Sequence, residues 1–276
     1  MLHKAIFDYL PGDAGLNVMY GDKELIKEAL VDPDVEKDIP WVEAISIDYG
    51  QRHRKELEYA AKTCKALGIK QTILDVGAIL SGKQVMLTDK DVKVPNIDYA
   101  DIKGVSPTYV PFRNGTLLSV ITAHAQKYVN EQIQEMAGDI VMDNEAEPGG
   151  TAYLDNGGNG IQEATAAAKD IAGVYFGAHS EDAQNWAYPD CTPEFIGAMA
   201  NAIYVGTYFC IRLHTPLQWL MKHEIVTLGD SLNVNFANTW SCYKGEEKHC
   251  GVCPTCRSRK QAFEAAGVRD PTEYQS

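Results

Sequence analysis

Hydrophobic positions along the chain follow two periods that alternate from one segment to the next. Short, mostly apolar runs, typical of strands buried on both faces, predict β-strands at residues 4–9, 41–50, 69–76 and 173–179. Apolar residues at helical spacing predict helices at about residues 20–30, 53–68, 114–129, 193–211 and within 213–228. The alternation of strands with helices predicts an α/β fold built on a doubly wound parallel sheet.

Two segments depart from this alternation. Residues 139–160 are acidic, rich in glycine and weakly periodic, which predicts an exposed, poorly ordered insertion within about 130–170. Residues 239–276 form a compact tail that is rich in cysteine. We therefore expect an α/β domain over residues 1–238, which carries the insertion, and a zinc-binding helical segment over residues 239–276.

The zinc expectation rests on four cysteines in the tail, Cys242, Cys250, Cys253 and Cys256. Two overlapping C-x2-C units let three sulfurs face one ion from a tight turn, and Cys242 completes the tetrahedral thiolate set that structural zinc prefers. An iron–sulfur cluster would suit the same ligands, reduced thiols without metal are the plainer alternative, and His249 is the nearest rival ligand. Four protein ligands leave no open position, so we expect a structural site.

Net charge and targeting signals narrow the class of protein. The formal net charge is −13. A general nucleic-acid-binding protein needs a basic face to neutralise phosphates, so we expect no direct nucleic-acid partner. No apolar run approaches the roughly 20 residues that span a bilayer, and the first residues lack the apolar core of a secretory signal. We therefore expect a cytoplasmic protein without a membrane partner.

Five motifs occur in a fixed order along the chain. They are Asp48-Tyr49-Gly50-Gln51-Arg52-His53; Val110-Pro111-Phe112-Arg113-Asn114; Gly177-Ala178-His179-Ser180-Glu181-Asp182 with Tyr188-Pro189-Asp190-Cys191; Thr215-Pro216-Leu217 with Lys222, Glu224 and Ile225; and the tail Thr239-Trp240-Ser241-Cys242-Tyr243 with Cys250-Gly251-Val252-Cys253-Pro254-Thr255-Cys256-Arg257. From about residue 41 to 276, the chain with these motifs resembles the 7-cyano-7-deazaguanine synthase family.

The resemblance implies the adenine nucleotide alpha hydrolase-like, or PP-loop, fold and an ATP-dependent carbon–nitrogen ligase. Such an enzyme converts 7-carboxy-7-deazaguanine and ammonia into 7-cyano-7-deazaguanine, which feeds queuosine in tRNA or 7-deazaguanine modification of DNA. ATP adenylates the carboxylate, ammonia displaces AMP to give an amide, and a second activation yields the nitrile. The implied cofactors are Zn²⁺, ATP and Mg²⁺. The implied partners are the 7-deazaguanine and ammonia, and the chain could form a homodimer.

The resemblance also implies a substrate pocket on loops that follow strands or precede helices, where open α/β sheets bind ligands. Taken alone, Arg113 could pair with a surface acid, and Asp182 and Asp190 could cap turns or bind magnesium. His53 and His179 could each be an acid–base group or a hydrogen-bonded structural residue. The expected substrate-binding residues are Gln51, Arg52, His53, Arg113, Asn114, Asp182, Tyr188 and Asp190, and no catalytic residue is assigned.

Three further side chains have a functional and a structural interpretation. Cys191 could be a nucleophile, although a small buried thiol is the better default. Trp240 and Tyr243 could stack on a base, or they could pack against the cysteine knuckle.

One segment departs from the family pattern. The family's pyrophosphate loop reads Ser-Gly-Gly-x-Asp-Ser, whereas residues 10–16 here read Leu10-Pro11-Gly12-Asp13-Ala14-Gly15-Leu16. Pro11 lacks a backbone N–H and the Asp13 carboxylate repels phosphate, so we expect weak ATP binding here. The nucleotide-binding residues would be Leu10, Gly12, Ala14, Gly15 and Leu16. Two functions remain open: the nitrile-forming ligase, or a relative that binds a 7-deazaguanine without ATP turnover or stops at the amide.

Overall fold

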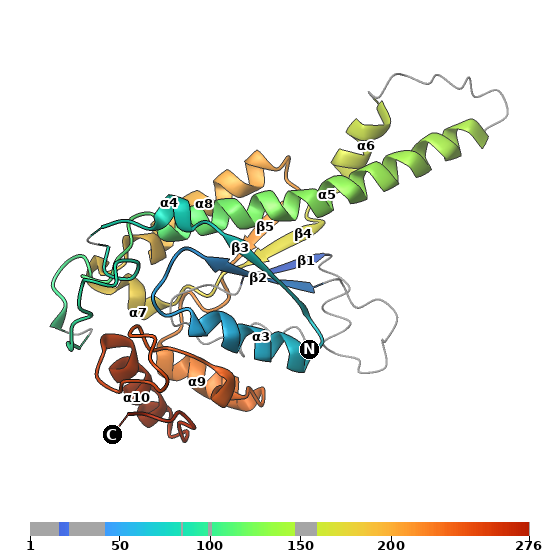
Figure 1. The fold of residues 1–276 in the computed structure, drawn as a ribbon. Helices are drawn as coiled ribbons and strands as arrows, with labels where there is room; N and C mark the ends of the chain where they lie inside the picture. The colour runs from blue at the N-terminus through green and yellow to red at the C-terminus, as the bar shows by residue number, and fades with distance from the viewer. Residues whose placement is uncertain (1–16, 22–41, 84, 99–100, 147–158, 276) are drawn as a thin grey trace.

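Five strands from the part of the chain that the structure describes form one mixed sheet at the centre of the molecule. The computed structural model describes residues 17–21, 42–83, 85–98, 101–146 and 159–275. Within these residues the strand order is β3-β2-β1-β4-β5 (Figure 1). The strands are β1 (Asn17–Gly21), β2 (Val42–Asp48), β3 (Lys70–Asp75), β4 (Ala172–Tyr175) and β5 (Ile211–His214).

The pairing directions correct one prediction. β2 and β3 run parallel, and so do β4 and β5, but β1 is antiparallel to both β2 and β4. The α/β class is therefore confirmed, while the prediction of a wholly parallel sheet is wrong at β1. The predicted helix at 20–30 begins inside this strand, and the rest of it, like the predicted strand at 4–9, lies outside the described residues. The apolar run of β1, Val18-Met19-Tyr20, is too short to be assigned to helix or strand from periodicity alone.

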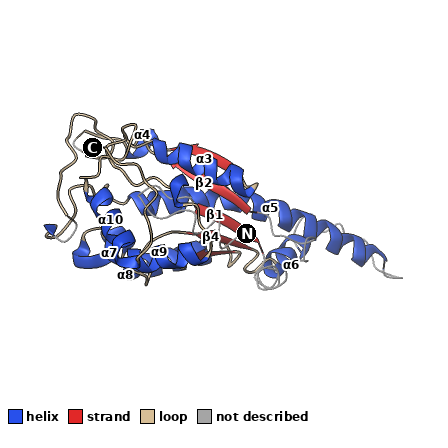
Figure 2. Ribbon diagram, turned by 90° about the horizontal axis from the view of Figure 1, so that it is seen from below, coloured by secondary structure: helices blue, strands red, loops and turns tan. Residues whose placement is uncertain are grey.

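Helices cover both faces of the sheet (Figures 1 and 2). On one face, Ile45 and Ile47 of β2 share a core with Leu117 and Ile121 of α5 (Arg113–Ala146). On the other face, Ala44 packs with α3 (Lys55–Leu67), which ends at a left-handed Gly68 cap. The alternation along β2 arises because successive side chains of a strand point to opposite faces. The other helices are α4 (Gly77–Leu80), α6 (Asn159–Ala167), α7 (Ser180–Ala183), α8 (Pro193–Gly206), α9 (Lys222–Ser231) and α10 (Pro254–Ala266), with 3₁₀ turns at Gln184–Trp186, Pro189–Cys191 and Phe236–Asn238.

Most of the predicted elements that fall on described residues are confirmed, with shifted ends. Two regions differ from the prediction. The predicted helix at 193–211 stops at Gly206, and the strand β5 that follows was not predicted. The helix expected to start near Thr215 begins instead at Lys222, because Thr215 and Gln218 form a turn in which the Thr215 hydroxyl donates to Gln218 Oε1 at 2.9 Å.

Part of the predicted insertion is helical. Helix α5 continues to Ala146, so residues 139–146 are helical, and residues 147–158 lie outside the described part of the chain. Val129, Ile133 and Ala137 continue the buried stripe of α5 and share a cluster with Ala164 of α6. The C-terminal part of α5 and the helix α6 project together from the body of the molecule (Figure 1). Among the described helices, none is long and apolar enough to cross a membrane.

The cysteine-rich tail packs on α9 and on the turn that precedes it. Leu217 and Ile225 share a small core with Phe236 and with Phe263 of α10, and the two phenylalanine rings meet edge to face at 5.0 Å. Figure 2 shows α9 and α10 together at the end of the molecule opposite α6. The tail is thereby fixed against the α/β domain.

Candidate functional site

The family-like motifs gather at the carboxyl edge of the sheet. The segment Tyr49–His53 follows β2, and the segment Phe176–Asp182 follows β4. Arg113 and Asn114 begin α5 between them. In open α/β sheets ligands bind outside the carboxyl ends of the strands, where the chain leads away in different directions. The candidate site lies at this edge.

Asn114 joins α5 to the segment that carries Asp190. Its backbone N–H donates to Asp190 Oδ2 at 3.0 Å, and its Nδ2 donates to the backbone oxygen of Asp190 and to Cys191 Sγ, both at 3.2 Å. Arg113 Nε donates to Asn114 Oδ1 at 3.2 Å. Burial raises the pKa of the Asp190 carboxyl, and the Arg113 charge and the Asn114 N–H offset part of that rise. A buried carboxylate therefore lies beside a buried cation.

Asp182 carries the second carboxylate of the site. Burial raises its pKa, and the charges of Lys222 and Arg113 offset part of this rise. His179 Nε2 lies 3.2 Å from Asp182 Oδ2. The backbone N–H of Lys222 donates to Glu181 Oε1 at 2.9 Å, which holds the start of α9 against α7. Two acids and two cations thus share one largely buried region.

The loop after β2 is held by a chain of buried polar contacts. Gln51 Nε2 donates to Glu56 Oε1 at 2.7 Å, and Glu56 Oε2 lies 3.2 Å from His53 Nε2. His53 Nε2 lies 3.4 Å from the Tyr49 hydroxyl, to which Arg113 Nη1 donates at 3.5 Å. These contacts connect the loop to the guanidinium of Arg113. Arg113 belongs to the charged cluster, which consists of Arg113, Asp182, Asp190 and Lys222.

Two of the expected substrate-binding residues hold neighbouring loops. Arg52 Nη1 donates to the backbone oxygen of Val92 at 2.6 Å. The Tyr188 hydroxyl lies 2.6 Å from Thr108 Oγ1 and accepts from Ser106 Oγ at 3.1 Å. Arg52 Nη1 and the Tyr188 hydroxyl are thus directed to protein partners, and direct contact with a substrate stays a prediction for both residues.

The eight expected residues therefore fall into two groups. The structure brings together Arg113, Asn114, Asp182 and Asp190, whereas Gln51, Arg52, His53 and Tyr188 form the supporting contacts around them. Three participants, Tyr49, Glu56 and Lys222, were not among the site residues predicted from the sequence. Tyr49 and Lys222 lie inside family-like motifs, but their importance depends on burial, which the motifs do not reveal.

The four tail cysteines form a compact cluster. Their sulfur atoms all lie within 4.8 Å of one another, and all four residues are buried. A tetrahedral zinc site with metal–sulfur bonds of about 2.3 Å has sulfurs about 3.8 Å apart, close to the 4.0 Å between Cys250 and Cys256. The backbone N–H groups of Cys250 and Cys253 donate to Cys242 Sγ and Cys250 Sγ, at 3.4 and 3.3 Å. The donor set and its size fit one metal ion.

Side chains around the cluster settle two alternatives. The rival ligand His249 lies outside it, because its Nε2 accepts from the backbone N–H of Ser241 at 3.1 Å. Trp240 and Tyr243 are buried against the cysteines, and Trp240 Nε1 donates to the backbone oxygen of Cys242 at 2.9 Å. The interpretation that both aromatic residues pack against the knuckle is confirmed.

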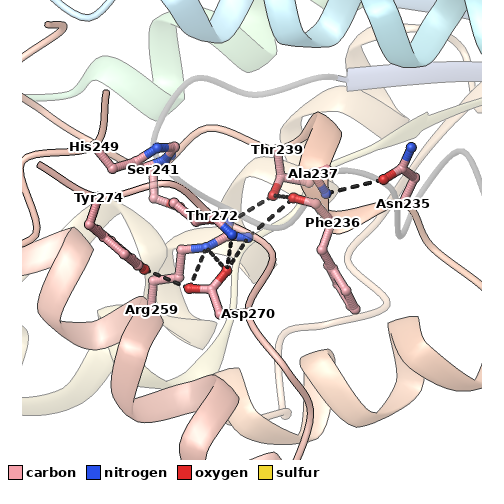
Figure 3. Close-up of polar contacts among 10 residues, drawn as sticks. All are labelled: Asn235, Phe236, Ala237, Thr239, Ser241, His249, Arg259, Asp270, Thr272 and Tyr274. Carbon is pink, nitrogen blue, oxygen red and sulfur yellow. Dashed lines mark hydrogen bonds and ion pairs between the residues drawn. The ribbon is translucent and has the colours of Figure 1, made fainter. Parts of the chain in front are cut away.

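Arg259 fastens α10 to the extended segment that leads into the cluster (Figure 3). Its guanidinium donates to Thr239 Oγ1 at 2.7 Å and forms an ion pair with Asp270 at 3.1 Å. The Tyr274 hydroxyl donates to the same carboxylate at 2.6 Å. Burial acts to raise the pKa of Asp270, but the Arg259 charge and the hydrogen bonds from Tyr274 and Thr272 bring it below its ordinary value.

The expected nucleotide loop, Leu10 to Leu16, lies outside the described residues. Its role, and that of Asp13, therefore stays a prediction.

Comparisons with known proteins place the chain in a family. The family model for queuosine biosynthesis protein QueC matches residues 34–144 and 160–267. The 7-cyano-7-deazaguanine synthase of Caldicellulosiruptor bescii is 36% identical over 84% of this chain and 85% of its own length. The synthases of Ruegeria pomeroyi and Thermoplasma volcanium are 39% and 36% identical, over 83% and 84% of this chain and 82% and 80% of their own lengths.

The matched ranges contain all eight expected substrate-binding residues and the four tail cysteines, and they leave out residues 10–16 and 145–159. The unmatched internal segment is thus narrower than the insertion predicted at 130–170. The chain belongs to the QueC family of queuosine biosynthesis proteins.

Proposed function

We propose that this chain is a 7-cyano-7-deazaguanine synthase, a ligase that uses ATP to convert 7-carboxy-7-deazaguanine and ammonia into 7-cyano-7-deazaguanine. Family membership supports the reaction and the PP-loop type of α/β fold. The observation that carries the proposal to a site is the cluster of Asp182 and Asp190 with Arg113 and Lys222 at the carboxyl edge of the sheet, in which all residues but the partly exposed Asp182 are buried.

The substrate has chemical groups that complement both charges of this cluster. Its guanine-like edge presents adjacent N–H donors, which one carboxylate can accept as a pair. Its own carboxylate is the acceptor that a guanidinium binds with two parallel N–H groups. We assign the N–H edge to the Asp190 and Asp182 side of the pocket and the carboxylate to Arg113. Because burial disfavours both protein carboxylates, a ligand that supplies N–H donors to them gains affinity.

The proposed cofactors have separate tasks. ATP would activate the substrate carboxylate, Mg²⁺ would neutralise phosphate charge, and ammonia would supply the nitrogen. Zn²⁺ would be held by the four tail cysteines as a structural ion, since all four positions of a tetrahedral site come from the protein. A second candidate, a family member that binds the 7-deazaguanine without turning over ATP, is favoured by Pro11 and Asp13 in the expected nucleotide loop.

Calorimetric titration of 7-carboxy-7-deazaguanine tests the site. We expect the wild-type chain to bind it, and Arg113→Lys to bind it roughly tenfold more weakly, because lysine cannot form the two parallel hydrogen bonds. Arg269→Lys, at an exposed position of the tail, is the matched control and should bind like wild type. A wild-type chain that gives no binding heat and no thermal shift with this ligand would overturn the proposal.

A further inference from the structure

The loop of the cysteine tail lies directly against the loop that follows β2. The Tyr243 ring, next to Cys242, lies 5.5 Å from the His53 ring, centroid to centroid, and both side chains are buried. Gly245 lies so close to Arg52 that a Cβ there would be 2.5 Å from the backbone oxygen of Arg52, and its φ is +67°. Only glycine fits this position without a shift of one loop.

The same contact continues along the first helix after the loop. Lys55 Nζ donates to the backbone oxygen of Glu247 at 3.1 Å, and the Tyr59 ring lies 5.2 Å from the Trp240 ring. The tail therefore touches the β2 loop and α3 on both sides of Cys242.

From His53, the buried contacts lead into the charged cluster. His53 Nε2 lies 3.4 Å from the Tyr49 hydroxyl, which accepts from Arg113 Nη1 at 3.5 Å. The Arg113 guanidinium also lies over the Tyr49 ring, 5.7 Å from its centroid. Because Tyr49 and His53 are almost fully buried, a shift of the loop that carries them moves the surface on which Arg113 rests.

We propose that Tyr243 and Gly245 are positioning residues of the ligand site: the cysteine knuckle sets the place of the β2 loop, and through His53 and Tyr49 it sets the orientation of Arg113. The tail then does more than stabilise the fold, because its loop forms one wall of the support for the guanidinium. This inference rests on the proposed function only for the identity of the ligand.

Hydrogen–deuterium exchange of the whole metal-loaded chain tests the proposal without a ligand. Gly245→Ala should speed exchange several-fold in peptides covering residues 49–54 and 110–116. Gly267→Ala is the matched control, since Gly267 has the same φ of +67° but no atom within 4 Å of the point where an added Cβ would lie. It should leave both peptides unchanged. Equal exchange of the two peptides in Gly245→Ala and wild type would overturn the proposal.

A second variant covers the case in which Gly245→Ala fails to fold. Tyr243→Leu removes the ring beside His53 and leaves all four cysteines in place. We expect it to keep wild-type metal content and cooperative melting, while 7-carboxy-7-deazaguanine binds several-fold more weakly and the 49–54 peptide exchanges faster. Unchanged binding and exchange in this variant would refute the positioning role. If the wild-type chain does not bind the ligand, the proposed function fails, and the exchange measurements still decide this inference.

Discussion

The backbone N–H of Asn114 donates to Asp190 Oδ2 at 3.0 Å, although the two residues lie 76 positions apart in the chain. This bond ties the first turn of α5 to the turn that precedes α8. It also fixes a buried carboxylate next to Arg113, where the positive end of the α5 dipole favours a negative charge. The charged cluster thus depends on the junction of two helices.

Two replacements of Asp190 test the contributions of its charge and of its hydrogen bond separately. Burial raises the folded pKa of Asp190 above the ordinary 3.8, so the carboxyl favours folding at low pH and this contribution is lost as pH rises through the folded pKa. At pH 7 Asp190→Asn, which keeps an acceptor for Asn114, should melt no lower than wild type but bind 7-carboxy-7-deazaguanine more weakly. Asp190→Ala should lower the free energy of unfolding by about 1–3 kcal/mol, because the buried backbone N–H of Asn114 is left unpaired. Thermal melts at pH 7 check both, and a lower melting temperature for Asp190→Asn would contradict the pKa argument.

The Arg259–Asp270 pair predicts a dependence of stability on acid. The folded pKa of Asp270 is lowered from 3.8, so its contribution is present above that value and is lost as pH falls through the folded pKa. Asp270→Asn should lower the free energy of unfolding by about 3 kcal/mol at pH 7, since it leaves the buried Arg259 without its counter-ion. The difference in the free energy of unfolding between Asp270→Asn and wild type should become smaller as the pH falls. Glu273→Gln, which breaks an exposed pair with Lys248, is the control and should change nothing measurable in urea melts. A pH-independent difference would argue against the ion pair.

The cysteine cluster predicts about one equivalent of zinc per chain. Cys253→Ser should lose the metal and melt early, because metal binding contributes directly to folding free energy. Cys64→Ser, at a buried cysteine outside the cluster, should keep the metal. Elemental analysis of the purified protein checks the identity of the ion. Iron, or no metal at all, would refute the zinc assignment.

The expected nucleotide loop predicts a gain of affinity on repair. The combined change Pro11→Ser, Asp13→Gly, Gly15→Asp and Leu16→Ser restores the family's loop residues, frees a backbone donor and removes the charge at position 13. ATP should bind more tightly to this variant than to wild type in calorimetry. If the wild-type chain already binds ATP as tightly as the repaired one, another surface holds the phosphates and the interpretation of residues 10–16 is wrong.

The sequence alone predicts local features well and distant ones poorly. The metal ligands follow from cysteine spacing, since three of them share one turn, and α3 follows from helical spacing that ends at Gly68. Strand β5 was missed because it is only four residues long and comes soon after the apolar helix α8, so the two apolar segments read as one. The partners of Asn114 and Tyr243 could not be predicted, since Asp190 and His53 come close only when the sheet and tail have assembled.

The most direct test of the proposed function is a single-turnover reaction with the enzyme in excess over 7-carboxy-7-deazaguanine, in the presence of ATP, Mg²⁺ and ammonia. Excess enzyme makes a slow reaction visible. If the chain is the synthase, mass spectrometry will detect 7-cyano-7-deazaguanine, with AMP formed only when both the substrate and ammonia are present. An unchanged carboxylate without ATP consumption, from a chain that binds the substrate and carries its metal, would contradict it and leave the non-catalytic alternative.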